Sequence, residues 1–201
     1  MKKNILIINI SNQKLHYFEF VKPIEDILNA NKIRFLTKHY KKLNARDVRN
    51  FSHIIISGTS LKDNEFVKEI NSFKWILLEK KPILGICGGM QIIGLVYEQE
   101  RRDREGDIKK DFSNILKKKT EIGFFMENFK KEFLGIIGDK EVYHLHNYYF
   151  DFNLLNDFEI FSESLDKTIP QAIKHKDKPL YGVLFHPEVR GKDLIERFCF
   201  I

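Results

Sequence analysis

The fold of this chain is decided by the stretch Pro82-Ile83-Leu84-Gly85-Ile86-Cys87-Gly88-Gly89-Met90-Gln91. The apolar run after Pro82 predicts a buried strand and the residues after Gly89 predict a helix, so Cys87 falls on a sharp turn between them. Gly85 and Gly89 suit such a turn, because strained backbone that passes close to its surroundings needs small residues. A cysteine at a helix N-terminus is favoured as the thiolate, so Cys87 is a candidate nucleophile; a buried structural cysteine is the alternative.

A base for this nucleophile is predicted near the other end of the chain, in Phe185-His186-Pro187-Glu188. Residues 180–185 have the pattern of a buried strand, and His186 and Glu188, two positions apart on an extended chain, would point to the same side. A carboxylate bonded to one ring nitrogen fixes the tautomer and leaves the other nitrogen free to take a proton from Cys87. His-Pro-Glu alone is more often a strand end with a surface ion pair. Together with the cysteine turn, it predicts a Cys87–His186–Glu188 triad.

Composition predicts one globular domain over residues 1–201, since a chain of 201 residues with 43% hydrophobic and 31% charged residues can bury a sizeable core. No apolar stretch approaches the roughly 20 residues of a membrane span, and the run Ile5–Ile8 is too short for a signal sequence, so we expect a cytoplasmic protein without a membrane partner. The cysteines, Cys87 and Cys199, form neither a disulfide framework nor a zinc spacing, and Cys199 is expected in the core.

The formal charge of +6 raises the question of nucleic acid. The lysines are scattered among acidic residues without an aromatic-interleaved basic motif, so a solvated surface is the better interpretation and no nucleic-acid partner is expected. The segment Glu98–Lys119 is densely charged and apolar-poor after the pattern breaks at Leu95. It predicts a solvated helix or loop, with a docking surface for a partner as the alternative.

Strand and helix patterns alternate in the first half of the chain, which predicts βαβ units and a mainly parallel sheet. The expected strands are Asn4–Ile10, Ile33–Leu36, His53–Ile56, Ile122–Phe129, Val142–His146, Phe158–Phe161 and Ile169–His175; the expected helices cover Val21–Leu28, Ala45–Asn50, Phe66–Leu77 and Lys192–Phe200. Sites in such sheets lie at the carboxyl ends of strands, so Ser57-Gly58-Thr59-Ser60 and Cys87 are expected to meet there.

These motifs resemble those of the class I (triad) glutamine amidotransferases, whose hallmarks are a Gly-x-Cys-x-Gly-x-Gln turn and a late Phe-His-Pro-Glu. The resemblance spans nearly the whole chain and implies an α/β fold of the flavodoxin-like kind, with an open, mixed, mainly parallel sheet flanked by helices and a nucleophile elbow. Within the family, the chain is most similar to the glutaminase subunit of GMP synthase, in Met90-Gln91, Phe158-Glu159-Ile160, Ile169-Pro170-Gln171-Ala172-Ile173 and Tyr181-Gly182-Val183.

The resemblance also implies further site residues. In the family, an N–H of a Ser-Gly-Gly-Pro turn joins the N–H after the cysteine to form an oxyanion hole, which places Gly88 and the Gly58-Thr59 turn around the oxyanion. Thr59 stands where the family has glycine, and a β-branched residue resists the conformations that glycine permits, so Thr59 N–H is a donor only if its peptide is suitably oriented. By the same resemblance, Gln91, His146, Asn147 and Tyr148 bind the substrate glutamine.

A metal site is considered at the two histidines of Val142–Tyr148. His144 and His146 share a face, and His186 could join them, but the sequence shows no acidic or cysteine ligand set with them. Core histidines or histidines that support the site are therefore favoured, and no metal is predicted.

The sequence thus predicts a glutaminase that hydrolyses glutamine through a thioester on Cys87 and supplies ammonia to a synthetase. No nucleotide-binding motif is present, so no cofactor is expected in this chain, and ATP and Mg²⁺ are expected on a separate ATP-dependent synthetase that by resemblance aminates XMP to GMP. Two alternatives stay open: a stand-alone γ-glutamyl hydrolase or peptidase, and a non-hydrolysing regulatory or binding subunit. The second is favoured by the altered Gly58-Thr59 turn and by Leu184, where relatives carry glutamine. The sequence does not identify the ammonia acceptor, the partner or the oligomeric state.

Overall fold

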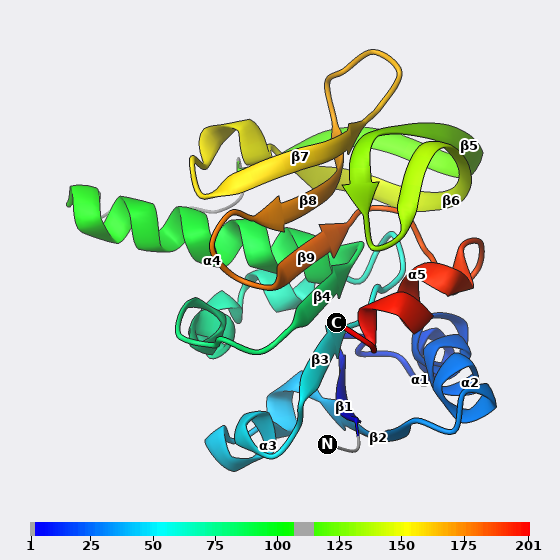
Figure 1. Cartoon of the computed structure of the whole chain (residues 1–201). Coiled ribbons are helices and arrows are strands. Elements are labelled where there is room, and N and C mark those ends of the chain that lie inside the picture. Colours follow the sequence, from blue (N-terminus) through cyan, green and yellow to red (C-terminus); the bar gives the residue numbers. More distant parts are fainter. Residues whose placement is uncertain (1–2, 107–114) are drawn as a thin grey trace.

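A seven-stranded sheet forms the centre of the protein (Figure 1). The structure is a computed structural model that describes residues 3–106 and 115–201. The strands of the sheet, in spatial order, are β2 (Arg34–His39), β1 (Asn4–Asn9), β3 (His53–Ile56), β4 (Ile83–Ile86), β9 (Leu180–Val183), β8 (Pro170–His175) and β7 (Phe158–Glu163). Strands β2, β1, β3, β4 and β9 run parallel, whereas β8 and β7 are antiparallel to their neighbours. The predicted open, mainly parallel sheet is confirmed.

Buried aliphatic side chains on alternating positions form a separate core on each face of the sheet. In β1, Leu6 and Ile8 face one core, whereas Ile5 and Ile7 face the other, and all four are 0% exposed. A strand that buries both faces must be apolar at successive positions, which is why the central strands are continuous apolar runs rich in isoleucine. These runs are therefore the sequence signal of a sheet covered on both sides.

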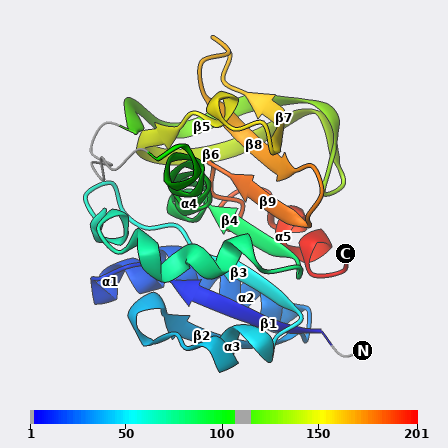
Figure 2. The same ribbon diagram turned by 90° about the vertical axis from the view of Figure 1, so that its left-hand side faces the viewer.

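Helical segments cover both faces of the sheet (Figures 1 and 2). They are α1 (Lys14–His16), a π-helical turn (Tyr17–Val21), α2 (Lys22–Ala30), α3 (Ala45–Arg49), α4 (Gly88–Glu105) and α5 (Lys192–Phe198), with 3₁₀ turns at Tyr40–Lys42, Glu65–Val67, Ile70–Leu77 and Phe152–Leu154. α2 and α5 pack on one face, while α4 and the turn Ile70–Leu77 pack on the other. Among the described residues, no helix is long and apolar enough to cross a membrane.

The prediction of one α-helix over Phe66–Leu77 is wrong, because the chain there forms two 3₁₀ turns. Ile70, Phe73 and Ile76 are buried, whereas Leu77 is only partly buried. A spacing of three residues matches the three residues per turn of a 3₁₀-helix better than the 3.6 of an α-helix. The hydrophobic pattern therefore located the segment but did not distinguish the two helix types.

The break in the apolar pattern after Leu95 does not end the helix, because α4 continues to Glu105. Its charged part is stabilised by pairs four residues apart, such as Arg102 with Glu98 at 2.8 Å and Arg104 with Glu100 at 3.0 Å. Residues 98–105 form a helix, one of the two predicted alternatives, but only residues 103–105 are exposed, since Glu98 and Gln99 are buried; residues 116–119 begin a strand instead. The rest of the charged segment, residues 107–114, lies outside the described residues.

A long antiparallel ribbon, which the strand predictions did not foresee as a separate unit, lies beside β7 in both views (Figures 1 and 2). Its strands β5 (Leu116–Phe133) and β6 (Ile136–Phe150) extend well beyond the predicted strands Ile122–Phe129 and Val142–His146. A bulge between Lys118 and Glu121 shifts the register, so that Glu121 lies opposite His146. The ribbon brings the predicted substrate-binding segment to the edge of the main sheet.

Candidate active site

The predicted site residues meet because β3, β4 and β9 are neighbours whose carboxyl ends lie at one edge of the sheet. Gly58 and Thr59 follow β3, Cys87 follows β4, and His186 follows β9. β9 is the last strand of the chain, yet it pairs with β4, so residues about 100 positions apart come together. The arrangement follows the rule that open α/β sheets carry their sites at the carboxyl ends of strands.

Cys87 lies on a strained turn between β4 and α4. Its φ of 49° and ψ of −103° are rare for a non-glycine residue, and its N–H donates to Val183 O at 2.8 Å. A Cβ at Gly89 would lie 2.4 Å from Ile56 O, so only glycine fits there. The thiol is 4% exposed, and Sγ donates to the carbonyl oxygen of Leu145 over 3.7 Å. The predicted strand, turn and helix around Cys87 are therefore present.

His186 and Glu188 form a buried pair, with Nδ1 of His186 2.7 Å from Oε1 of Glu188. The two residues do not lie on an extended chain as predicted, because β9 ends at Val183 and residues 187–189 form a turn. The N–H groups of Val189 and Arg190 both donate to His186 O, which closes the turn and brings the carboxylate to the ring. The predicted contact is thus present, but a turn produces it.

The charges around His186 favour its imidazolium form. Complete burial opposes this form, yet the negative charges of Glu188 and Cys87 outweigh it and hold the pKa of His186 well above its ordinary value. Nε2 of His186 is buried and has no hydrogen-bond partner among the described residues. This nitrogen is therefore available to exchange a proton with Cys87 or with a substrate.

The turn after β3 lies directly against the histidine. A Cβ on Gly58 would lie 2.7 Å from Cε1 of His186 and 3.4 Å from Cβ of Cys87, so a larger residue there would displace the ring. Thr59 and Gly88 both line a small cavity beside Cys87. Thr59 does not have a positive φ, whereas Cys87 does. The backbone of Thr59 is therefore not in a conformation that favours glycine.

Asp63, which the sequence analysis missed, anchors this turn. Its Oδ2 accepts hydrogen bonds from Thr59 Oγ1 at 3.0 Å and from Asn12 N at 2.8 Å, and lies 3.3 Å from Nδ1 of His16. Burial opposes ionisation, but hydrogen bonds from Asn12, His16 and Thr59 hold the pKa of Asp63 below its ordinary value. No local pattern marks Asp63, because its partners come from two separate segments.

The predicted glutamine-binding residues line the same small cavity as Cys87. Nε2 of Gln91 donates to Tyr148 O at 2.7 Å, and Oδ1 of Asn147 accepts from Thr120 Oγ1 at 3.0 Å. The cavity measures about 20 Å³, which holds about one water molecule and no glutamine side chain. Gln91 therefore ties the elbow helix to β6 beside this cavity.

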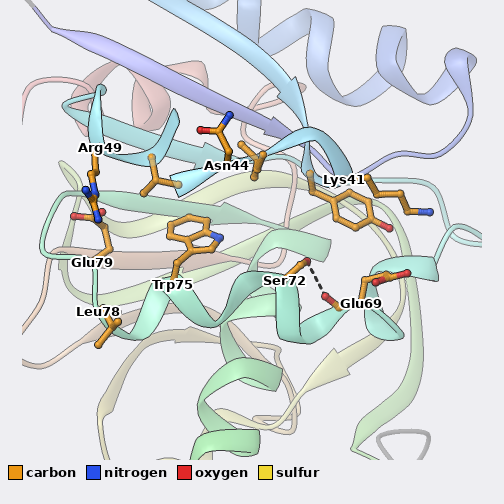
Figure 3. Close-up of a pocket in the computed structure, with 11 residues that line it drawn as sticks. Lys41, Asn44, Arg49, Glu69, Ser72, Trp75, Leu78 and Glu79 are labelled. Carbon is orange, nitrogen blue, oxygen red and sulfur yellow. Dashed lines mark hydrogen bonds between the residues drawn. The ribbon is translucent and has the colours of Figure 1, made fainter. Parts of the chain in front are cut away.

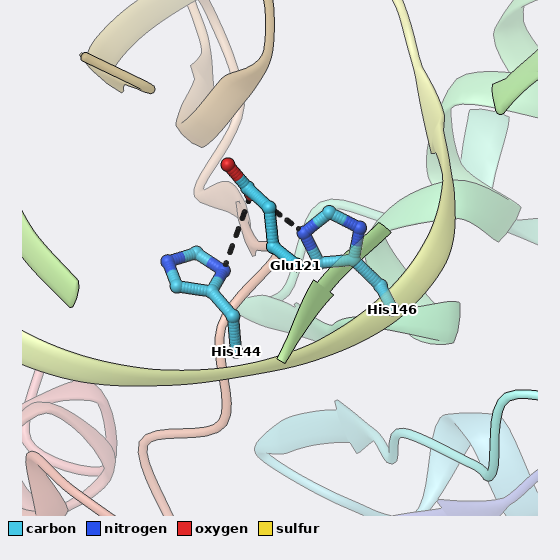
Figure 4. Close-up of side chains that lie close together, drawn as sticks. All are labelled: Glu121, His144 and His146. Atoms are coloured by element: carbon cyan, nitrogen blue, oxygen red, sulfur yellow. Dashed lines mark hydrogen bonds and ion pairs between the residues drawn. The ribbon is translucent and has the colours of Figure 1, made fainter. Parts of the chain in front are cut away.

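His146 and His144 lie with Glu121 in one buried cluster (Figure 4). Nε2 of His146 is 2.9 Å from Oε2 of Glu121, and burial holds the pKa of His146 below its ordinary value despite this carboxylate. The expectation that no acidic residue accompanies the histidines is wrong. Glu121 belongs to the other strand of the ribbon, so only strand pairing reveals it. His186 is not part of this cluster.

Two larger cavities differ in their relation to the triad. One of about 680 Å³ is lined by Tyr40, Arg49 and Trp75 among others and contains no triad residue (Figure 3). Another, an open cleft of about 530 Å³, is lined by His186 together with residues such as Phe20 and Leu61. The second cleft therefore borders His186, although the histidine itself is fully buried.

The remaining cysteine, Cys199, is 0% exposed in the core between α5 and the sheet, as predicted. Burial raises the pKa of its thiol to about 12. Cys199 is therefore chemically inert in the folded protein.

An elbow cysteine beside a histidine–carboxylate pair, at the carboxyl edge of an α/β sheet, is the arrangement of a thiol-dependent acyl-transfer site. The family model of class-I glutamine amidotransferases matches residues 17–200, and the chain belongs to this family.

Curated relatives include a subunit of the glutamine-hydrolysing GMP synthase from Methanococcus aeolicus, which is 32% identical over 150 residues, 73% of this chain and 71% of that protein. The corresponding subunit from Methanosphaera stadtmanae is 36% identical over 147 residues, 70% of this chain and 72% of that protein. Among solved structures, a Thermoplasma acidophilum protein described as the same GMP synthase subunit superposes with a TM-score of 0.79 at 21% identity, covering 100% of this chain and 94% of that one. The likeness to this structure shows the fold.

Proposed function

We propose that this chain hydrolyses glutamine at Cys87 and supplies the ammonia to a separate ATP-dependent synthetase of the GMP synthase type. The observation that carries the proposal is the buried pair of His186 and Glu188, joined at 2.7 Å, at the edge where the strained Cys87 turn ends β4. Membership in the class-I glutamine amidotransferase family supports the reaction, and the GMP synthase subunits found in the curated relatives support the acceptor.

In the proposed mechanism, the Cys87 thiolate attacks the side-chain amide carbon of glutamine and forms a tetrahedral intermediate. His186 then donates its proton to the leaving nitrogen, so that ammonia departs and a thioester stays on Cys87. In the second half, His186 takes a proton from water, and the resulting hydroxide hydrolyses the thioester to glutamate. Glu188 keeps the ring oriented and supports its positive charge through both steps.

The N–H of Gly88 is one donor for the oxyanion, and the N–H of Thr59 is the second when its peptide faces the cavity. Gln91, His146, Asn147 and Tyr148 are placed to surround the glutamine. Since the cavity of about 20 Å³ is too small for this substrate, the segments around Thr59 and Tyr148 must separate before it binds. Docking of a synthetase is a suitable trigger, because it would couple glutamine use to the demand for ammonia.

The partner carries the ATP and Mg²⁺ in this proposal, because the chain has neither a P-loop nor a dinucleotide-binding motif. The decisive experiment mixes the purified chain with the ATP-dependent GMP synthase subunit of the same organism, XMP, ATP and Mg²⁺. We expect GMP to form with glutamine as the nitrogen source, and the Cys87→Ser variant to support it only with added ammonium salt. Failure of glutamine-dependent GMP formation, with ammonia-dependent formation intact, would refute the assigned acceptor.

A γ-glutamyl hydrolase is the second candidate, and the open cleft of about 530 Å³ beside His186 favours it, since such a cleft could hold a larger leaving amine. Glutamine and γ-glutamyl dipeptides should be compared without any partner. Rapid turnover of the dipeptides by the isolated chain would favour this candidate. A chain that hydrolyses neither substrate, even with the synthetase, would instead be a regulatory subunit.

A further inference from the structure

The ribbon carries a buried cluster of ionisable groups, of which the proposed mechanism uses only His146, as one of the residues around the glutamine (Figure 4). Glu121 lies opposite His146 across the ribbon, and His144, two residues earlier on β6, points to the same side. His144 is 0% exposed, His146 2%, and the side chain of Glu121 12%. We propose that Glu121, His144 and His146 bind a divalent transition-metal ion of the Zn²⁺ type.

The distances suit three ligands around one ion. Oε2 of Glu121 lies 2.9 Å from Nε2 of His146 and 3.8 Å from Nδ1 of His144. Ligands bonded to Zn²⁺ at about 2.0–2.1 Å in tetrahedral geometry lie about 3.3–3.4 Å apart, between these two values. All three candidate ligand atoms lie within 4.8 Å of one another, so side-chain shifts would bring them to this spacing around an ion, and water would complete the coordination.

His144 supplies the independent indication of a ligand. Its Nε2 lies 3.1 Å from Oε1 of Glu127, an acceptor, so this nitrogen carries the proton and Nδ1 carries the lone pair. Nδ1 is buried without a hydrogen-bond partner and faces the carboxylate of Glu121 at 3.8 Å. Two buried acceptors that face one another repel, and a cation between them turns this repulsion into coordination.

The candidate ligands are also held by hydrogen bonds from neighbouring side chains, as metal ligands commonly are. Glu127 holds His144 in one tautomer and is itself bonded by Ser162 Oγ at 2.8 Å, while Nε2 of Gln171 donates to Glu121 at 2.7 Å. No lysine or arginine among the described residues hydrogen-bonds to Glu121 or Glu127. A divalent cation would therefore compensate the negative charge of Glu121, whose side-chain hydrogen bonds come from His146 and Gln171.

Such an ion would brace the part of β6 that borders the candidate active site. Leu145, between the two histidines, offers its carbonyl oxygen to Sγ of Cys87, and Asn147 and Tyr148 line the small cavity. The ion would hold this segment through the side chains of His144 and His146, the second of which lines the same small cavity as Cys87. Its role is positioning, and the proposal does not depend on the identity of the ammonia acceptor.

The test measures Zn²⁺ retained after equilibrium dialysis of the full chain, with the Cys87→Ser variant to exclude binding by the thiol. We expect one Zn²⁺ per chain in both proteins. His144→Gln places an amide nitrogen near the position of Nε2, so it keeps a donor for Glu127 and removes only the ligand atom. His144→Gln and Glu121→Gln should each weaken binding at least a hundredfold, and Glu127→Gln by about tenfold.

Two matched controls lie outside the cluster. Glu141→Gln removes a partly exposed carboxylate from the same ribbon, and His175→Gln removes a buried histidine from β8; both should retain Zn²⁺. Co²⁺ should give a visible absorption spectrum that Cys87→Ser keeps and His144→Gln loses, with circular dichroism showing that each variant is folded. No retained Zn²⁺ in the parent protein, or retention that survives both Glu121→Gln and His144→Gln, would overturn the proposal.

Discussion

The hydroxyl of Thr59 donates a hydrogen bond of 3.0 Å to Oδ2 of Asp63, and this bond connects the turn beside Cys87 to the segment that contains Asn12. Oδ1 of the same carboxylate accepts from Nδ2 of Asn12 at 2.8 Å. A buried acceptor with several donors fixes the conformation of the segments that supply them. Asp63 therefore determines how freely the turn at Thr59 can move.

The first prediction concerns the acid stability that Asp63 confers. Because its pKa is lowered in the folded protein, the ionised carboxylate stabilises the fold above the unfolded pKa of about 3.9, and this stabilisation is lost as the pH falls through the folded value. Asp63→Asn should lower the free energy of unfolding by about 1–3 kcal/mol at pH 7, with the difference shrinking below about pH 4. Urea unfolding from pH 7 to pH 3 measures it, with the exposed Asp139→Asn as control. An equal difference at every pH would contradict the prediction.

The second prediction tests the conformation of Thr59. If its peptide is unproductive in the isolated chain, one oxyanion donor is missing, which costs about 3 kcal/mol or a factor of roughly 10²–10³ in rate. Thr59→Gly should raise partner-free ammonia release toward the rate seen with the synthetase. Thr59→Val loses the bond to Asp63 but keeps the β-branch, so it should not produce this rise. A high basal rate that neither Thr59→Gly nor the partner alters would show that the oxyanion hole is already formed.

The third prediction uses the contact between Gly58 and His186. Because an added Cβ would lie 2.7 Å from Cε1 of the ring, Gly58→Ala should displace the base and lower glutamine turnover by about 10²-fold or more. Reagent labelling of Cys87 at high pH should persist, since the thiolate then forms without the histidine. Thermal unfolding controls for loss of the fold, and a stable variant with unchanged turnover would place His186 outside the reaction.

The fourth prediction is selective labelling. A glutamine-like chloroketone or diazo reagent should modify Cys87 near neutral pH, because the elbow presents its sulfur at the site that also contains His186. Cys199 should stay unmodified, since it is fully buried and its thiol pKa is raised to about 12. Peptide mass spectrometry gives the ratio of the two products. Equal modification of both cysteines in the folded protein would argue against an activated Cys87.

The fifth prediction separates the roles of the histidine and the carboxylate. His186→Ala should abolish glutamine hydrolysis, whereas Glu188→Gln should keep the fold and lower turnover by about 10²- to 10⁴-fold, because an amide supports the imidazolium less well. The rate of ammonia release from glutamine, measured for each variant with the synthetase present, tests both expectations. Parent-like turnover in folded His186→Ala would remove this residue from the mechanism.

Most of the sheet could be predicted because its signals are local. The isoleucine runs of β1 and β3 and the Gly-x-Cys-x-Gly turn each lie within a few residues, so hydrophobic pattern and turn chemistry identify them. The turn type at His186 and the 3₁₀ geometry of Ile70–Leu77 could not be predicted in this way. Both features depend on how these segments pack against distant parts of the chain. The local sequence pattern is compatible with a turn or an extended chain at His186, and with an α-helix or a 3₁₀-helix at Ile70–Leu77.

The sequence by itself determined which residues we propose for the chemistry: Cys87 on its turn, and His186 with Glu188 two residues later. Only the tertiary structure decided that β9 pairs with β4, which brings these residues to one edge of the sheet. It also decided that Glu121 meets His146 across the ribbon, at a register set by a bulge. Local patterns encode the conformation of a segment, whereas pairing between distant segments depends on the free energy of packing the whole chain, which no single stretch contains.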